Sequence, residues 1–91
     1  MAKMFVTLKI MPDSPETNLN SLREEIKGIV EKYGGELLDK DEIVPVAFGL
    51  KALKVIFYID ESKGSEEISE AVNNLEEISS CEVVDMRRAV G

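Results

Sequence analysis

The 91-residue chain contains no histidine, no tryptophan and a single cysteine, and these shortages exclude several kinds of site. Without histidine there is no imidazole to act as a general base, to activate a serine or cysteine nucleophile, or to ligate a metal. The lone Cys81 cannot form an internal disulfide or a thiolate metal centre. These counts remove several enzyme classes, but composition alone does not say what the protein does.

Long apolar runs are also missing. The longest, Val55–Ile59, has five residues, whereas a membrane-spanning helix needs roughly 20. The amino-terminal residues lack the apolar segment and the small-residue cleavage site of a secretion signal. We therefore expect a cytoplasmic protein without a membrane partner.

Acidic residues outnumber basic residues by 18 to 11, which gives a net charge of −7. Nucleic acids are bound by clustered lysine and arginine side chains, so we expect no direct nucleic-acid partner. The same charge permits a basic protein partner, or it only keeps the domain soluble. A composition of 44% hydrophobic and 32% charged residues is typical of a globular protein. The length predicts one domain over residues 1–91.

Two segments alternate between apolar and polar residues, which is typical of strands with one buried face. The predicted buried residues are Met4, Val6, Leu8 and Ile10 in residues 3–10, and Leu53, Val55, Phe57 and Ile59 in residues 50–59. Residues 11–18 are predicted to be a loop. Residues 36–44 indicate a weaker strand. Pro45 cannot donate to a neighbouring strand, so this strand lies at a sheet edge or ends there. Residues 81–88 predict a last strand, whose facing is ambiguous because Val83 and Val84 are adjacent.

Two amphipathic helices lie between these strands. The apolar stripe of the first, at spacings of three or four, comprises Leu19, Leu22, Ile26, Ile29 and Tyr33. Thr17 or Asn18 can cap its start, and Gly34-Gly35 ends it. Ser65 is predicted to cap the second helix, whose buried stripe comprises Ile68, Ala71, Val72, Leu75 and Ile78. The order strand, helix, strand, strand, helix, strand predicts an α+β, ferredoxin-like fold: a four-stranded antiparallel sheet with two helices on one face.

Two segments carry features that this pattern does not explain. Arg87-Arg88 is the only adjacent arginine pair in an acidic chain. It either protects the edge of the last strand or presents cations to an acidic or phosphate-bearing site on a partner. Phe48 lies in a turn between Pro45 and Gly49, so its ring either covers the core or anchors a protein interface.

Both segments resemble the archaeal elongation factor 1-beta family, and the similarity extends over essentially the whole chain. Pro45, the aromatic Phe48, Gly49, Lys51 and Leu53, within IVPVAFGLKALKV, match the strand–turn–strand hallmark of the family. VTLKIMPDSPETNL resembles the family's first strand and following loop, and CEVVDMRRAV resembles its last strand. The resemblance implies a ferredoxin-like guanine-nucleotide exchange domain of translation elongation. Such a domain acts by protein binding, so we expect a protein that is not an enzyme and that binds no cofactor or metal of its own.

The resemblance also implies a partner, elongation factor 1-alpha, the GTPase that delivers aminoacyl-tRNA. In the family, the hallmark aromatic contacts the second domain of the GTPase, and Phe48 takes that place here. A basic side chain at the end of the last strand reaches the magnesium and phosphate region. Arg88, preceded by Arg87, matches that place, where the eukaryotic pattern has lysine. The implied partner-binding residues are Pro45, Phe48, Gly49, Lys51, Arg87 and Arg88, and we expect a monomer when the protein is free.

A regulatory domain of the same fold is the main alternative. Such a domain would dimerise and sense a small molecule at a helix–strand interface, and calorimetry with amino acids and nucleotides would detect the binding heat. An RNA-binding sheet would need exposed aromatic residues in a basic surround. Phe5, Phe57 and Tyr58 do not supply a convincing platform of that kind.

Overall fold

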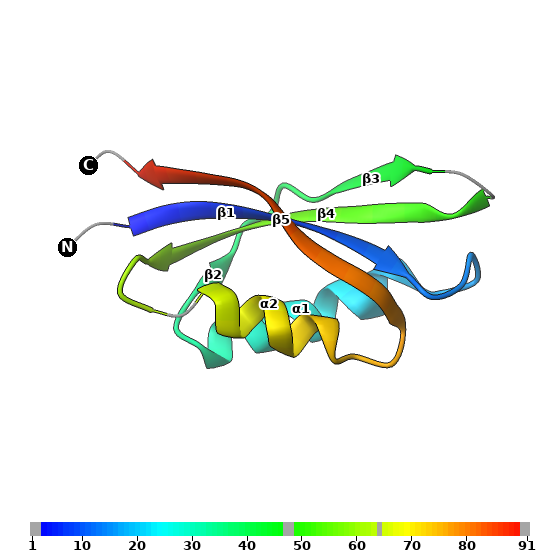
Figure 1. Cartoon of the computed structure of the whole chain (residues 1–91), viewed down its shortest axis with the longest axis horizontal. Coiled ribbons are helices and arrows are strands. Elements are labelled where there is room, and N and C mark those ends of the chain that lie inside the picture. The colour runs from blue at the N-terminus through cyan, green and yellow to red at the C-terminus, as the bar shows by residue number, and fades with distance from the viewer. Residues whose placement is uncertain (1–2, 47–48, 64, 90–91) are drawn as a thin grey trace.

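The computed structural model describes residues 3–46, 49–63 and 65–89. In chain order the elements are β1 (Lys3–Pro12), α1 (Leu19–Lys32), β2 (Glu36–Leu37), β3 (Glu42–Pro45), β4 (Lys51–Asp60), α2 (Ser65–Asn73) and β5 (Ile78–Ala89). The strands form one antiparallel sheet in the order β2–β4–β1–β5, with β3 also paired to β4. Both helices lie against the same face of this sheet (Figure 1), which we call the helix face, and the opposite side is the open face. The α+β arrangement agrees with the predicted ferredoxin-like fold.

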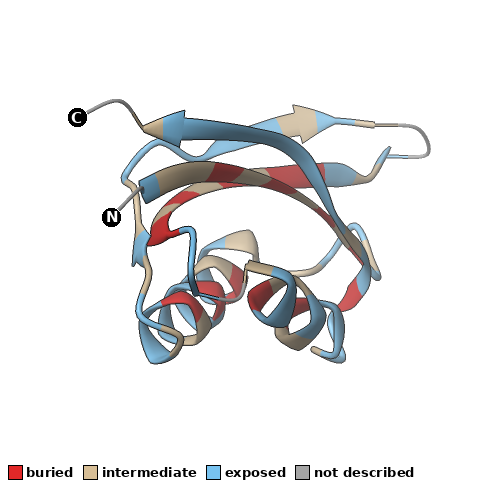
Figure 2. Cartoon of the chain, turned by 60° about the vertical axis from the view of Figure 1, so that its left-hand side comes forward, coloured by how far each residue is buried: buried red, intermediate tan, exposed pale blue. Residues whose placement is uncertain are grey.

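The core is the apolar layer between the helix face and the two helices (Figure 2). The alternation predicted for β1 and β4 is confirmed, except that Met4 is only partly buried. Val30, which the predicted stripe of α1 does not include, is fully buried. The residues at 0–1% exposure are Val6, Leu8, Ile10, Leu22, Ile26, Val30, Ala52, Leu53, Val55, Phe57, Ile59, Ile68 and Val72. Burying each large side chain among them stabilises the fold by roughly 1.5–3 kcal/mol.

The single strand predicted over residues 36–44 is two short strands, so the sheet has five strands rather than four. β2 pairs with Phe57 and Tyr58, and β3 pairs with residues 51–54. Both lie at the edge that Pro45 predicts. Between them, the Arg23 guanidinium on α1 donates to the Leu38 carbonyl oxygen over 3.3 Å and to Asp41 Oδ1 over 2.9 Å. At Leu38, α1 therefore supplies the donor to the carbonyl oxygen, while the Leu38 N–H donates to the Ile56 carbonyl oxygen of β4 over 2.8 Å.

Two further predictions were wrong at element boundaries. β1 continues through Met11 and Pro12 instead of ending at Ile10, because a proline without an N–H donor is tolerated at the end of a strand. α2 ends at Asn73, so neither the partly buried Leu75 nor Ile78 belongs to its buried stripe. Ile78 instead begins β5, which starts three residues before Cys81, and its backbone N–H donates to the Leu75 carbonyl oxygen over 3.2 Å.

A β-bulge in β5 explains why the facing of Val83 and Val84 is ambiguous in the sequence. Thr7 pairs with Asp85 and Leu8 pairs with Val83, so Val84 is an extra residue between them. Val84 and Asp85 both line a groove on the open face, whereas Val83 shares the side of the buried Leu8. The bulge therefore changes the phase of the strand before it reaches Arg87 and Arg88.

Candidate functional site

The first group of predicted site residues lies in the β3–β4 hairpin, at the right-hand end of the sheet in Figure 1. Pro45 pairs with Lys51, and both are exposed. The Val46 N–H donates to the Leu50 carbonyl oxygen over 2.8 Å and closes the hairpin. Gly49 has a φ of 76°, a left-handed conformation that glycine adopts without steric cost. Phe48 lies outside the described residues.

The second group lies near the end of β5. Arg87 pairs with Phe5, and Arg88 pairs with Met4. Because successive residues of a strand point to opposite sides, Arg87 faces the open side and Arg88 the helix side. The guanidinium of each arginine contacts one carboxylate: Arg87 Nε lies 2.9 Å from Asp85 Oδ2, and Arg88 Nη2 lies 3.3 Å from Glu61 Oε2.

Both arginine side chains are highly exposed, at 79% for Arg87 and 74% for Arg88. Ion pairs at such exposure contribute only about 0–1 kcal/mol. Each cation can therefore exchange its carboxylate for a group on a partner at little cost.

The fold does not bring the hairpin and the arginines together. Lys51, the first residue of β4, pairs with Pro45. Asp60, the last residue of β4, pairs with Lys3. Lys3 in turn pairs with Ala89, next to the arginines. Ten residues of β4 at about 3.3 Å each separate the two groups by about 30 Å. The longest dimension of the molecule is 42 Å, so the predicted site residues form two sites at opposite ends.

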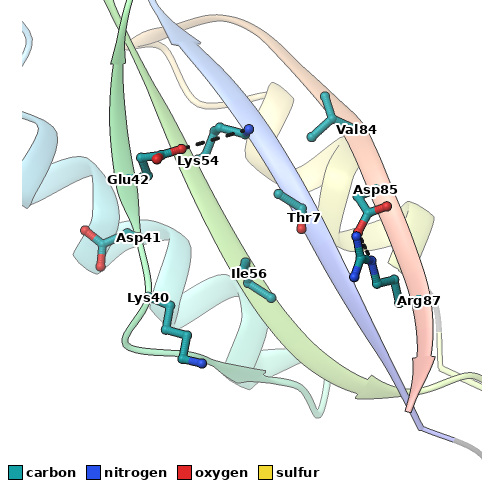
Figure 3. Close-up of a pocket in the computed structure, with 9 residues that line it drawn as sticks. All are labelled: Thr7, Lys40, Asp41, Glu42, Lys54, Ile56, Val84, Asp85 and Arg87. Carbon is teal, nitrogen blue, oxygen red and sulfur yellow. Dashed lines mark hydrogen bonds and ion pairs between the residues drawn. The ribbon is translucent and has the colours of Figure 1, made fainter. Parts of the chain in front are cut away.

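A groove of about 640 Å³ crosses the open face between these ends (Figure 3). Thr7 and Ile56 lie at its base, while charged residues of the β2–β3 connection and of β5 lie at its sides. Several of these charges are paired with one another: Lys54 Nζ lies 4.0 Å from Glu42 Oε1, and Arg87 contacts Asp85. Sequence reasoning missed this groove because its sides are brought together by strand pairing, which no local motif reveals.

Two groups with shifted pKa values have structural roles. Hydrogen bonds from the Ser62 N–H and hydroxyl, at 2.9 and 2.7 Å, lower the pKa of Asp60 and fix the turn after β4. Burial raises the pKa of the Cys81 thiol, which opposes its use as a nucleophile. Within residues 3–46, 49–63 and 65–89, no group of three or more acidic or cysteine side chains is arranged to hold a metal ion. In the same ranges, neither helix has the length and apolarity needed to cross a bilayer.

Comparison with known proteins identifies the family of the chain. The model of the EF-1 guanine nucleotide exchange domain matches residues 5–89, which include the hairpin and both arginines. The chain belongs to this exchange-domain family. The resemblance drawn from the hairpin and the last strand is thereby confirmed, and membership supports a role in nucleotide exchange during translation elongation, with a GTPase as the partner.

Curated members of the exchange-domain family match almost from end to end. Elongation factor 1-beta of Methanosphaera stadtmanae is 39% identical, with 97% of this chain and 98% of the relative covered. The protein of the same name from Sulfolobus acidocaldarius is 40% identical over 93% of this chain and 94% of its own length. The protein of that name from Pyrococcus furiosus is 42% identical, with 89% of this chain and 89% of the relative covered. The similarity therefore extends over both ends of the sheet.

Proposed function

We propose that this chain, acting as a monomer, promotes exchange of GDP for GTP on elongation factor 1-alpha by contacting it at both ends of the sheet. The observation that carries the proposal is the strand register, which separates Lys51 from the arginine pair by about 30 Å along one continuous strand. A rigid body with two separated contact points suits a GTPase that offers a docking pocket on one domain and a nucleotide site on another.

The hairpin supplies docking affinity. Aromatic side chains often dominate the binding energy of protein interfaces, and Phe48 occupies the loop between Pro45 and Gly49. The hydrogen bond between Val46 and Leu50 holds the two sides of this loop together. Lys51 follows at the first position of β4, where its ammonium group is exposed to the partner.

The arginine end acts on the nucleotide site. Arg88, with Arg87 beside it, competes for the carboxylates or backbone groups of the GTPase that hold magnesium, because guanidinium binds carboxylates strongly. Loss of the ion removes charge neutralisation from the nucleotide phosphates, so GDP leaves faster. No covalent bond is made or broken. By linkage, a coupling of about 3 kcal/mol between the chain and the nucleotide changes nucleotide affinity more than a hundredfold.

Two substitutions separate the two roles in a GDP-release assay. Phe48→Ala removes the proposed anchor and should raise the chain concentration needed for half-maximal release by about tenfold or more. Arg88→Ala should lower the maximum release rate at saturating chain, and Arg87→Ala tests the neighbouring cation in the same way. Fluorescent GDP bound to elongation factor 1-alpha reports both quantities.

Lys27→Ala is the matched control, because it removes an exposed cation from α1, away from both ends. The control should release GDP like the parent, and all variants should show the parent's circular dichroism spectrum. If Phe48→Ala and Arg88→Ala both match the parent at every concentration, the assignment of these sites is wrong.

A further inference from the structure

A second concave surface lies beside the hairpin. The loop between β1 and α1 and the strands β3 and β4 together enclose about 260 Å³. Its apolar lining consists of Pro12, Pro15, Leu19 and Ile43, and Lys51 lies at the same concavity. We call this surface the Ile43 pocket.

Ile43 is unusually exposed for a large apolar residue in a strand, at 51%. It pairs with Leu53, whose side chain lies in the core against the helices. Directly paired residues share a face of the sheet, so Ile43 points to the helix side, where it lines the same pocket as Leu19 at the start of α1. An apolar side chain thus remains in water at the edge of the core.

The charge around the Ile43 pocket differs from that of the rest of the chain. Among the residues that the structure describes, no acidic side chain lines the pocket, and Lys51 is its only charged lining residue. The remaining polar lining is hydroxyl or amide. The open-face groove, by contrast, is lined by six charged residues, some of them paired with one another. Depletion of charge is characteristic of the centre of protein interfaces.

We infer that the Ile43 pocket receives an apolar side chain of the GTPase, next to the contact made by the hairpin. The inference rests on the proposed function. Lys51 belongs both to the hairpin contact and to the pocket, so the two surfaces are continuous. Apart from Lys51, the described lining offers a charged side chain no ionic partner to offset its lost hydration, whereas the apolar lining residues can pack against an apolar side chain. The docking surface therefore extends from the hairpin to the loop before α1.

Ile43→Thr tests this inference. Threonine keeps the branched Cβ that suits a strand, so β3 should persist, while the side chain becomes smaller and polar. We expect the Kd for nucleotide-free elongation factor 1-alpha, measured by calorimetry, to rise about fivefold to tenfold. The maximum GDP-release rate at saturating chain should stay at the parent's value, because the arginine end is unchanged.

Val83→Thr is the matched control. Val83 is also a branched residue on the helix side of the sheet, 39% exposed, but it lies on β5, away from the pocket. Its variant should bind with the parent's Kd. If Ile43→Thr binds with the parent's Kd, or if both variants weaken binding equally, the inference is overturned while the proposed function stands. Failure of the parent chain itself to bind or to accelerate release would overturn the proposed function and this inference with it.

Discussion

Asp60 shows how one carboxylate fixes the connection between the sheet and α2. It ends β4 at 9% exposure, and its Oδ1 accepts hydrogen bonds from both the N–H and the hydroxyl of Ser62. The Lys63 N–H donates to the Asp60 carbonyl oxygen over 2.9 Å. These bonds favour the ionised side chain and hold the pKa of Asp60 below its ordinary value of 3.8. The turn that carries Glu61, the carboxylate paired with Arg88, is thereby fixed.

The lowered pKa of Asp60 predicts how stability depends on pH. The unfolded chain binds this proton more tightly than the folded chain does, so ionised Asp60 stabilises the fold above its unfolded pKa, ordinarily 3.8. The contribution is lost as the pH falls through the lower folded-state pKa. Asp60→Asn should therefore reduce the free energy of unfolding at pH 7, and the difference from the parent should shrink below about pH 4. Urea unfolding at several pH values measures this, and a difference that stays constant down to about pH 2 would contradict it.

The adjacent arginines show what a residue pattern leaves open. The sequence identifies Arg87 and Arg88 as a pair, but it cannot assign either to a face, because the extra residue Val84 changes the phase of the strand. Only the pairing of β5 with β1 shows that the two guanidinium groups lie on opposite sides of the sheet.

Among the elements, α1 has the start that its sequence predicts. Asn18 is the N-cap, and its Oδ1 accepts hydrogen bonds from the backbone N–H groups of Asn20 and Ser21 over 3.0 and 3.1 Å. Gly34, with a φ of 87°, follows the carboxyl end in the left-handed conformation expected of a helix stop. Local sequence signals were sufficient to predict both ends of α1, because residues of the same segment supply the hydrogen-bond partners of the backbone groups there.

Removal of this cap should weaken the fold measurably. Asn18→Ala leaves two backbone donors of the first turn without their side-chain acceptor, so the free energy of unfolding should fall by about 1 kcal/mol. Urea denaturation followed by circular dichroism measures the change. Asn74→Ala, at an exposed position after α2, is the control and should have less effect. Equal stability of Asn18→Ala and the parent would show that the cap does not stabilise the helix.

The sequence predicts the buried face of some strands but not of others. β1 and β4 are central, so each has one face in the core and one on the open side, and their period of two is clear. β5 is an edge strand in which Val83, Val84 and Met86 are all exposed, so apolar residues do not mark a buried face. Between β2 and β3, Arg23 of α1 contacts Leu38, and no local pattern reveals this contact.

For the molecule as a whole, the family resemblance identified candidate contact residues but not their arrangement. Pro45 and Lys51 lie at one end of β4 and the arginines lie near the other, because β4 pairs with β1 and β1 pairs with β5, each in an antiparallel register. The separation of about 30 Å follows from strand pairing alone. The proposed exchange mechanism therefore depends on the sheet as a rigid spacer, with docking at one end and displacement of magnesium at the other.

The rate at which fluorescent GDP leaves purified elongation factor 1-alpha, measured with increasing amounts of this chain, tests the central claim most directly. The account predicts that the rate rises with chain concentration and reaches a plateau well above the intrinsic rate of the GTPase. A rate that stays at the intrinsic value at every concentration of correctly folded chain would contradict it.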